Sequence, residues 1–289
     1  MQRQTADVTL IVPTRHESAN IQRLLGRVEA TMGSLRVDWQ VLFVDDSDDE
    51  TPEVIRELRN SGHPVLLLHR PGDQRVGGLA GALAQGLRAV DSRVIAVMDA
   101  DLQHPPEALT KLLPPLLDGS ADIAVGSRYL PGGTFEGLDG PWRRLVSKGS
   151  RTLVWGVFPE TRKVSDPGSG FFGLRHDVLD HVDLRPEGFK MLLEVLVRGR
   201  WDKAHEVPYN FAGRMYGASN ATFYEGLRFL RHVGRLWTGT RTKVRLGHQE
   251  PLADVLIEDG FGADATERTP LLVKTRAFVV ERDLSVRGA

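Results

Sequence analysis

Residues 94–107 read VIAVMDADLQHPPE, in which a short apolar run ends in two acids one residue apart, Asp99 and Asp101. The run has the length and continuous hydrophobicity of a strand buried on both faces. Because side chains alternate along a strand, both acids can point to one side while Ala100 points away. The two prolines that follow suit the first turn of a helix. The stretch therefore predicts a buried strand, a polar turn and a helix start.

Four similar runs predict a mainly parallel sheet flanked by helices. Segments with helical character separate the runs, and we expect the first crossover helix to begin near Ser18 and the third near Gly81. Runs of this kind alternating with helices are typical of α/β proteins. The five predicted strands lie at Val8–Val12, Val41–Val44, Val65–Leu68, Val94–Met98 and Asp122–Tyr129.

Polar stretches follow four of these strands. In a parallel α/β sheet, ligands bind beyond the carboxyl ends of the strands, where loops and helix N-termini collect. Three acidic clusters and one basic, glycine-bearing loop are therefore expected to face one crevice. They are PTRHESAN (13–20), DDSDDET (45–51), RPGDQRVGG (70–78) and DADLQH (99–104).

The carboxylates of Asp99 and Asp101, with the side-chain carbonyl of Gln103 nearby, suit a hard divalent cation such as Mg²⁺ or Mn²⁺. Such a cation would keep some waters and take further oxygens from a diphosphate ligand. The alternative is that the acids cap the next helix or are solvated in a loop. Their position opposite the other acidic strand ends favours the metal site.

The acids that follow the first two strands also have two interpretations. Asp45 and Asp46 are either N-cap and first-turn carboxylates or acceptors for the N–H groups of a base and for ribose hydroxyls. Ser47 and Thr51 fit capping well. Glu17 either caps the first helix or accepts hydrogen bonds from a nucleotide. Both interpretations can hold together, one for each Asp.

Composition bounds the class of protein. The chain has 289 residues, 41% hydrophobic and 26% charged, which predicts a globular fold with a large core. The formal charge of −1 predicts no overall attraction to nucleic acid. The absence of cysteine excludes disulfides, thiolate metal sites and cysteine nucleophiles. No apolar stretch reaches the length of a membrane span and the N-terminus lacks a signal-peptide core, so we expect a cytoplasmic protein.

Two segments read as basic amphipathic helices, one beginning at Pro141 and one between Thr222 and Thr238. Each is interpreted either as a surface helix packed on the sheet or as a helix that docks on an anionic membrane. The first has Arg143, Arg144, Lys148 and Arg151 opposite Trp142, Leu145, Val146, Leu153 and Val157. The second has Arg228, Arg231 and Arg235 opposite Phe223, Leu227, Leu230, Val233, Leu236 and Trp237.

Eight ordered motifs resemble the polyprenyl-phosphate (dolichol-phosphate) mannosyltransferases of glycosyltransferase family 2. They are VPTRHESAN, VDDSDDET, GGLAGALAQGL, MDADLQHPPE, VGSRYLPGG, SDPGSGFFG, EGFKMLLEVLVRG and EVPYNFAGRMYGASN, and they cover roughly residues 7 to 240. The resemblance implies a GT-A fold over residues 1–246, with residues 247–289 as a tail or small added unit of unknown role.

The same resemblance implies metal-dependent, inverting transfer of a sugar, first of all mannose from GDP-mannose, to a polyprenyl or dolichyl monophosphate. It also implies a peripheral position on the cytoplasmic face of a membrane. Residues implied to bind the nucleotide sugar are Pro13, Arg15, Glu17, Val44, Asp46, Asp99, Ala100, Asp101 and Gln103, of which Asp99, Asp101 and Gln103 hold the metal. Those implied for the acceptor phosphate are Arg128, Ser169, Lys190, Arg214 and Asn220, beside Asp166, and those implied to be catalytic are Asp101, Arg128 and Arg214.

Some positions depart from the family pattern. Arg15 and His16 stand where an aromatic residue and Asn are usual, Asn220 stands where Lys is usual, and Ser47 replaces a glycine. These departures keep open UDP-glucose or another nucleotide sugar as donor, and a soluble acceptor. A non-catalytic protein that binds a nucleotide sugar or a lipid phosphate is the alternative from another class. No G-x-G-x-x-G follows the first strand and no P-loop motif is present, which disfavours nicotinamide and P-loop enzymes.

Overall fold

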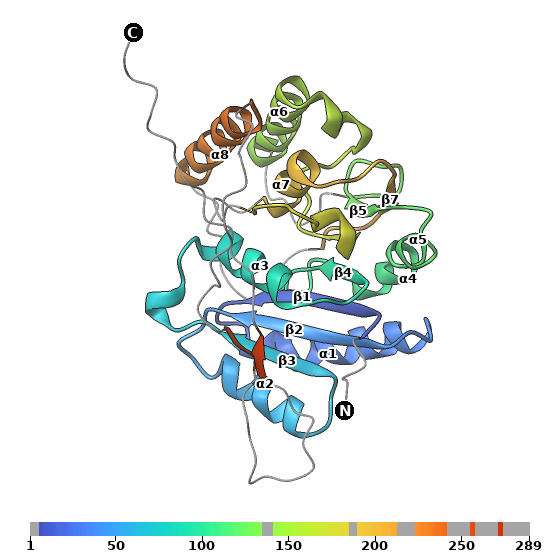
Figure 1. The fold of residues 1–289 in the computed structure, drawn as a ribbon, viewed down its shortest axis with the longest axis vertical. Coiled ribbons are helices and arrows are strands. Elements are labelled where there is room, and N and C mark those ends of the chain that lie inside the picture. Colours follow the sequence, from blue (N-terminus) through green and yellow to red (C-terminus); the bar gives the residue numbers. More distant parts are fainter. Residues whose placement is uncertain are drawn as a thin grey trace.

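Seven strands form one twisted sheet in the order β3-β2-β1-β4-β6-β5-β7, in which β6 runs antiparallel to its two neighbours (Figure 1). The structure is a computed structural model that describes residues 6–134, 141–184, 190–212, 223–241, 255–257 and 271–273. The strands are β1 (Val8–Thr14), β2 (Trp39–Asp45), β3 (Val65–His69), β4 (Val94–Val97), β5 (Ile123–Ser127), β6 (Phe172–Arg175) and β7 (Ala204–Pro208).

The five strands predicted from apolar runs are confirmed as β1 to β5. Every residue of β1 and of β4 is buried, as expected for strands covered on both faces. The sequence analysis did not predict β6 and β7. β6 lies between β4 and β5, so these two parallel strands are separated by one antiparallel strand, and β7 lies at the edge beyond β5.

Helices cover both faces of the sheet. Two large clusters of buried side chains, one on each face, form the core. On one face lie α1 (Ser18–Gly33), α2 (Thr51–Asn60), α4 (Leu109–Leu112) and α5 (Pro114–Leu117); on the other lie α3 (Gly78–Ala89) and α7 (Met191–Arg198). Short 3-10 turns occur at η1 (Gly72–Gln74), η2 (Pro106–Ala108), η3 (Pro159–Lys163) and η4 (His176–Leu179).

The predicted helix starts are confirmed. α1 begins at Ser18, α3 begins at Gly78, and the double proline begins η2, which leads directly into α4. Pro106 occupies the first position of η2, where its missing N–H costs no hydrogen bond.

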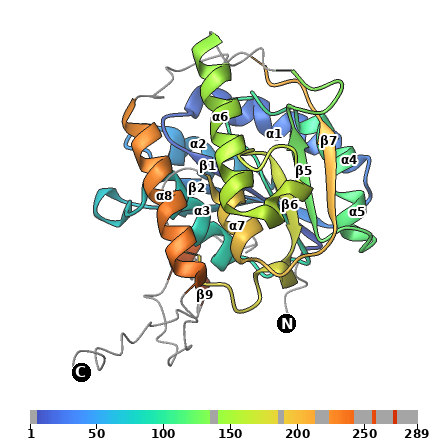
Figure 2. The same cartoon turned by 90° about the horizontal axis from the view of Figure 1, so that it is seen from above.

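Two long helices, α6 (Pro141–Val157) and α8 (Phe223–Arg241), lie side by side outside α7 (Figure 2). Side chains of α6 are described from 149 onward, and those of α8 from 229 to 239. A third apolar cluster joins the three helices and contains Val154, Phe158, Leu193, Phe229, Val233 and Leu236.

The predicted apolar faces of α6 and α8 are only partly buried. Leu153, Leu230 and Trp237, which belong to these faces, are 37%, 53% and 44% exposed. The helical wheel identified the apolar stripe correctly, yet each stripe is wider than the surface of α7 that it covers. No described helix is long and apolar enough to cross a membrane.

Within residues 247–289, β8 (Val255–Ile257) and β9 (Leu271–Val273) pair antiparallel, and β8 lies close to β3. The boundary predicted at residue 246 stays a prediction.

Two helical glycines give a matched test of packing. A Cβ at Gly81 would lie 2.0 Å from the carbonyl oxygen of Val76, whereas a Cβ at Gly26 would meet no atom within 4 Å. We expect Gly81→Ala to lower the free energy of unfolding by about 1–3 kcal/mol. Gly26→Ala should raise it by about 0.5–1 kcal/mol, since alanine restricts the unfolded chain more than glycine does. Urea unfolding followed by circular dichroism measures both, and equal stability of the two variants would contradict the assigned close approach.

Candidate active site

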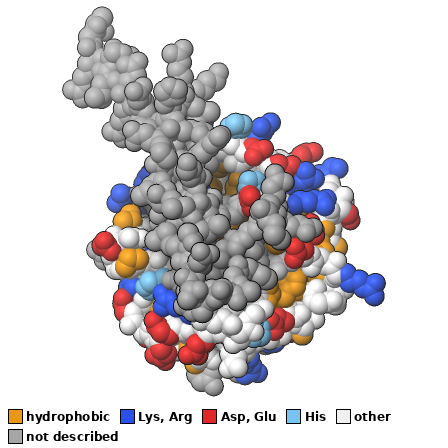
Figure 3. Space-filling model, turned by 60° about the horizontal axis from the view of Figure 1, so that its bottom comes forward, with side chains coloured by type: hydrophobic (Ala, Val, Ile, Leu, Met, Phe, Trp, Pro, Cys, Tyr) orange, Lys and Arg blue, Asp and Glu red, His pale blue; other side chains and the backbone are white. Residues whose placement is uncertain are grey.

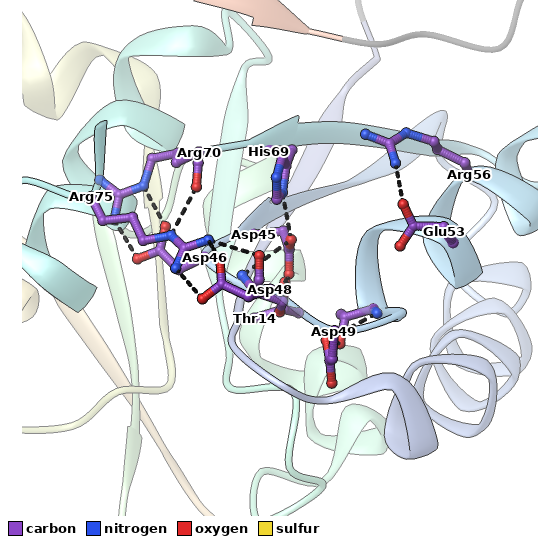
Figure 4. Close-up of polar contacts among 12 residues, drawn as sticks. Thr14, Asp45, Asp46, Asp48, Asp49, Glu53, Arg56, His69, Arg70 and Arg75 are labelled. Carbon is purple, nitrogen blue, oxygen red and sulfur yellow. Dashed lines mark hydrogen bonds and ion pairs between the residues drawn. The ribbon is translucent and has the colours of Figure 1, made fainter. Parts of the chain in front are cut away.

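The carboxylate of Asp45, at the end of β2, ties together the ends of three neighbouring strands (Figure 4). It is fully buried and accepts hydrogen bonds from the hydroxyls of Thr14 (2.8 Å) and Ser47 (2.6 Å). The Nδ1 atom of His69, at the end of β3, lies 2.8 Å from its other oxygen. Asp45 is therefore a structural acceptor that fixes the edge of the sheet, and it does not face a ligand.

The loops after β1 and β2 are joined to each other. The Ser47 hydroxyl accepts from the backbone N–H of His16 (2.9 Å), and the Thr51 hydroxyl accepts from that of Glu17 (3.1 Å). α2 begins after Glu50 without a side-chain cap. The capping interpretation of Ser47 and Thr51 is thus wrong, because both hydroxyls are used by the neighbouring loop.

Asp46 forms a bidentate ion pair with Arg70. The two oxygens of Asp46 accept from Nε (2.6 Å) and Nη2 (2.5 Å) of Arg70, whose side chain is 1% exposed. The guanidinium of Arg75 also donates to both oxygens of Asp48, and it donates to the backbone carbonyl of Ser47 (Figure 4). The basic loop after β3 is therefore clamped to the acidic loop after β2, as the expectation of a shared crevice requires.

The other residues implied to bind the nucleoside line the same edge. Pro13 and Val44 are paired in the register of β1 and β2, and both are buried. Arg15 is exposed, and Glu17 accepts from the side-chain amide of Asn20 (2.6 Å). Glu17 precedes α1 and makes no side-chain cap, so its capping interpretation is also wrong.

The acid turn, Asp99–His104, follows β4 and is held in one conformation. Leu102 adopts a left-handed backbone with φ of 61°, and the N–H of Gln103 donates to the Asp101 carboxylate (3.1 Å). Ala100 is buried in the core, as the predicted alternation requires. The Asp99 side chain is 40% exposed, while Asp101 is buried.

The donor set of this turn fits a hard cation. The amide nitrogen of Gln103 donates to the carbonyl of Ala212 (2.9 Å), so the amide oxygen is the atom that a cation would use. With the two carboxylates, this gives three oxygen donors of the kind that Mg²⁺ and Mn²⁺ prefer. The parts of the chain that the structure describes contain no cluster of three His, Cys, Asp or Glu side chains arranged to hold a metal. A cation here would need oxygens from its substrate as well.

His104 supports the acid turn from beneath. Its Nδ1 accepts from the backbone N–H of Asp99 (3.1 Å), and its ring stacks on Phe171 with centroids 5.3 Å apart. Tyr209 and Phe211 complete the aromatic cluster. Burial is the main cause that lowers the pKa of His104 to about 4, so the ring is neutral at physiological pH.

A small pocket, whose charged lining residues are three basic side chains and one acidic one, lies beside the end of β5. Arg128, which follows β5, makes a bidentate ion pair with Asp166 at 2.7 and 2.9 Å. Burial opposes the charge of Arg128, but the Asp166 carboxylate outweighs it and raises the pKa of Arg128 above its usual range. Lys190, Arg151 and Tyr129 also line the pocket. The structure thus brings together Arg128, Asp166 and Lys190, three of the residues implied for the acceptor phosphate.

Lys190 lies deep in this pocket. Its ammonium group is 4.6 Å from the centre of the Phe229 ring, and a Cβ at Gly168 would lie 2.7 Å from it. Burial, and next the charge of Arg128, lowers the pKa of Lys190 to about 8, against the attraction of Asp166. The pocket is therefore positive before any ligand enters it.

Three residues implied for the acceptor are not part of this arrangement. The hydroxyl of Ser169 exchanges hydrogen bonds with the backbone of Phe171 and does not line the pocket. Arg214 and Asn220 lie outside the described residues. Their roles stay predictions.

The turn Asp166–Gly170 forms a shared wall between the pocket and the acid turn. At one end Asp166 binds Arg128, and Gly168 leaves the space that Lys190 fills. At the other end a Cβ on Gly170 would lie 3.3 Å from the His104 ring and 3.4 Å from a carboxylate oxygen of Asp99. One short segment thus places the acids and the cations next to each other.

Sequence reasoning missed several residues of this edge. Arg70 was seen only as part of the basic loop 70–78, and neither His69 nor His104 was singled out. Phe171 and Tyr209 were not singled out within their motifs. The sequence did contain a signal for His104. This histidine stands between the two acids and the two prolines, a position from which a buried side chain can support the acid turn.

Comparison with known proteins shows which family the chain resembles. A family model described as "Glycosyl transferase family 2" matches residues 9–183. The chain is 38% identical over 257 residues to a dolichol-phosphate mannosyltransferase of Pyrococcus furiosus, covering 88% of this chain and 71% of that protein. It is 33% identical over 244 residues to the dolichol-phosphate mannosyltransferase of Saccharomyces cerevisiae, covering 80% and 87%. It is 35% identical over 230 residues to a polyprenol monophosphomannose synthase of Mycolicibacterium smegmatis, covering 75% and 82%.

Solved structures show the same fold at lower sequence similarity. Glucosyl-3-phosphoglycerate synthase of Mycobacterium tuberculosis, crystallised with Mn²⁺, UDP and its product, superposes with a TM-score of 0.57 at 19% identity. The match covers 86% of this chain and 85% of that one. The predicted GT-A fold is confirmed by this likeness together with the matching family model.

Asp45 gives a test of what holds the edge of the sheet. Asp45→Ala would leave the hydroxyls of Thr14 and Ser47 and the ring of His69 without their buried acceptor. We expect the free energy of unfolding to fall by about 3 kcal/mol. Chemical denaturation measures it, with Asp38→Ala, at an exposed position before β2, as the control expected to change it by less than about 0.5 kcal/mol. An equal loss of unfolding free energy in the two variants would show that Asp45 does not hold the strand ends together.

Proposed function

The chain belongs to glycosyl transferase family 2 and is a glycosyltransferase, and from this premise we propose that it transfers mannose from GDP-mannose to the phosphate of a polyprenyl phosphate. The relatives that share 33–38% of its residues are dolichol-phosphate and polyprenol-phosphate mannosyl enzymes, which supports this acceptor class and this sugar.

The observation that carries the proposal is the shared wall at Asp166–Gly170. A glycosyl transfer to a phosphate must hold two anions side by side, the leaving diphosphate and the attacking phosphate. Three oxygen donors suited to a divalent cation lie on one side of the wall, and a positive pocket lies on the other. With a cation bound to those donors, each anion would have its own counter-charge within one crevice.

Asp99, Asp101 and Gln103 would hold a divalent cation, Mg²⁺ or Mn²⁺, and the cation would supply positive charge to the departing diphosphate. His104 and the N–H of Gln103 keep the acid turn in position before substrate arrives. Because this positioning is complete in the free protein, little reorganisation is needed on binding.

The acceptor side needs no strong base. A phosphate monoester has a second pKa near 6, so its oxygen is already anionic at neutral pH. Arg128 and Lys190 would hold that phosphate and align one oxygen for in-line attack on the sugar carbon, with inversion there. Arg214 and Asn220 are proposed to act on the same phosphate. Arg128 suits this role because its planar guanidinium binds oxygens in pairs, although in the free protein it binds Asp166.

The nucleoside would lie over Pro13 and Val44, at the ends of β1 and β2. Arg15, Glu17 and Asp46 are proposed to contact its base and ribose. Arg70 binds both oxygens of Asp46 through one edge of its guanidinium, Nε and Nη2, so the position of this carboxylate is fixed. The exposed Arg15 stands at the position where the resemblance implies a stacking residue.

We expect the purified protein to transfer mannose from GDP-mannose to a polyprenyl phosphate in detergent, in the presence of Mg²⁺ or Mn²⁺. A chelator should abolish the transfer and the added metal should restore it. Asp101→Ala should lower kcat/KM by about 100-fold or more. Mass spectrometry of the lipid product measures the transfer, and UDP-glucose and soluble acceptors are tested in parallel.

The matched control for this assay is Asp202→Ala, because the Asp202 side chain is 84% exposed and lies away from the acid turn. It should leave kcat/KM unchanged. Full activity of Asp101→Ala would refute the metal site, and transfer only from another nucleotide sugar would refute GDP-mannose as donor.

We also propose that α6 and α8 dock on an anionic membrane and bring the pocket to the lipid headgroup. Leu230 and Trp237 are seven residues apart and share one exposed face of α8, while Arg231 and Arg235 are exposed beside them. Exposed apolar side chains next to basic ones are typical of helices that lie in a membrane interface. Figure 3 shows basic, acidic and apolar side chains interspersed over the described part of one face.

The docking surface predicts binding to vesicles. The intact protein should float with vesicles that contain anionic lipid, and the double variant Leu230→Ser/Trp237→Ser should bind at least about tenfold more weakly, because it loses two buried apolar side chains. Val76→Ser is the control, since Val76 is 73% exposed in the loop after β3. Equal loss in the control, or no binding by the unmodified protein, would contradict docking through α8.

A further inference from the structure

Arg151 points into the molecule, not onto the basic surface where the sequence placed it. Its guanidinium carbon lies 4.1 Å from the ring centre of Tyr129 and 4.6 Å from that of Trp155. Trp155 is one helical turn further along α6, and its indole N–H donates to the carbonyl of Val164 (3.2 Å). Two aromatic rings, one of them anchored, therefore hold the guanidinium.

The same guanidinium lines the pocket beside Arg128 and Lys190. The charged residues of the lining are Arg128, Arg151, Lys190 and Asp166, which leave two positive charges in excess. The pocket is narrow, with a volume of about 10 Å³, room for one water-sized atom. An oxygen of a phosphate group is of that size.

We propose that Arg151 is a further residue that binds the acceptor substrate, and that the edge of its guanidinium donates hydrogen bonds to an oxygen of the acceptor's phosphate monoester. The identity of that anion rests on the proposed function. The placement of Arg151 rests on the pocket itself.

Three observations support this role. Contacts with Tyr129 and Trp155 occupy the ring-facing surfaces of the guanidinium, so its hydrogen bonds must lie near its own plane. Its Nε atom is buried and has no hydrogen-bond partner among the described residues, which is costly for a cation unless a ligand accepts from the group. The excess of two positive charges matches the two negative charges that a phosphate monoester carries near neutral pH.

A purely structural role for Arg151 predicts different behaviour. If the side chain served only to pack Tyr129 and Trp155, its loss would lower stability and affect donor and acceptor alike. A role in docking α6 on the membrane predicts an effect that disappears in detergent. A phosphate contact predicts a selective effect on the acceptor, which persists in detergent.

The test compares Arg151→Gln and Arg151→Lys with the unmodified protein, using a polyprenyl phosphate in detergent at saturating sugar donor. We expect Arg151→Gln to raise the KM for the acceptor about tenfold or more, as the loss of a hydrogen bond to a charged group implies. The KM for the donor should stay within about twofold, since the donor lies across the shared wall. Arg151→Lys keeps the positive charge and loses the planar guanidinium. Its KM for the acceptor should lie between those of the unmodified protein and Arg151→Gln.

A second readout needs no turnover. Inorganic phosphate alone should raise the thermal unfolding temperature of the unmodified protein, and this shift should be smaller in Arg151→Gln. Arg200→Gln is the charge-matched control, because Arg200 is exposed, follows α7 and does not line the pocket. It should match the unmodified protein in both measurements.

The outcomes separate this inference from the proposed function. Unchanged acceptor KM and unchanged phosphate shift in Arg151→Gln would overturn the role of Arg151, whatever the enzyme transfers. An equal rise of both KM values would assign Arg151 to packing and would also overturn it. If polyprenyl phosphate proves not to be the acceptor, a reduced phosphate shift in Arg151→Gln still supports the anion contact, and the failure falls on the proposed acceptor alone.

Discussion

The ion pair between Arg128 and Asp166 is the contact on which the crevice depends. It joins the loop after β5 to the turn that precedes β6, and both of its side chains are largely buried, 13% and 3% exposed. A buried pair of this kind is costly to break, because either partner alone would be an uncompensated charge. The pair therefore fixes the turn Asp166–Gly170, and the turn in turn fixes the distance between the basic pocket and the acid turn. Antiparallel β6 makes this possible, since its N-terminal end lies at the carboxyl edge of the parallel strands.

The crevice keeps opposite charges apart by placing a neutral group between them. His104 is close enough to Asp101, Arg128 and Asp166 for each to influence its pKa, yet burial keeps its ring uncharged. A charged imidazole here would place a positive charge beside the acid turn and would oppose the binding of a cation there. The aromatic cluster around His104 therefore keeps a neutral, buried ring near Asp101, Arg128 and Asp166.

Most of the sheet was predictable from the sequence, because β1 to β5 are continuous apolar runs whose burial depends on hydrophobicity alone. β6 and β7 were not, since FGLR and AHEVP are short and mixed, and only pairing with β4 and β5 makes them strands. The acid turn was placed on the correct edge because strand ends collect there, and Arg128 was placed in the site by the resemblance to the family. What the sequence could not reveal is the choice of partner: Ser47 and Thr51 look like caps until the loop after β1 is seen to use their hydroxyls. Arg151 looks like surface charge until Tyr129, 22 positions earlier in the chain, is found against it.

α8 connects the two proposals made for this molecule, the docking surface and the phosphate pocket. Phe229 faces inward, where its ring lies beneath the Lys190 ammonium, and Leu230, the next residue, faces outward. Lys190, which lines the pocket, and the proposed membrane surface therefore lie on opposite sides of α8, whose diameter is about 10 Å with its side chains. A lipid phosphate at the membrane surface would then have only a short path to the pocket, while its chain stayed among the exposed apolar residues. Phe229 belongs to the apolar cluster that joins α8 to α6 and α7. A shift of α8 on docking would therefore move the Phe229 ring relative to the Lys190 ammonium. The basic pocket is thus the part of the site that membrane binding would affect most directly.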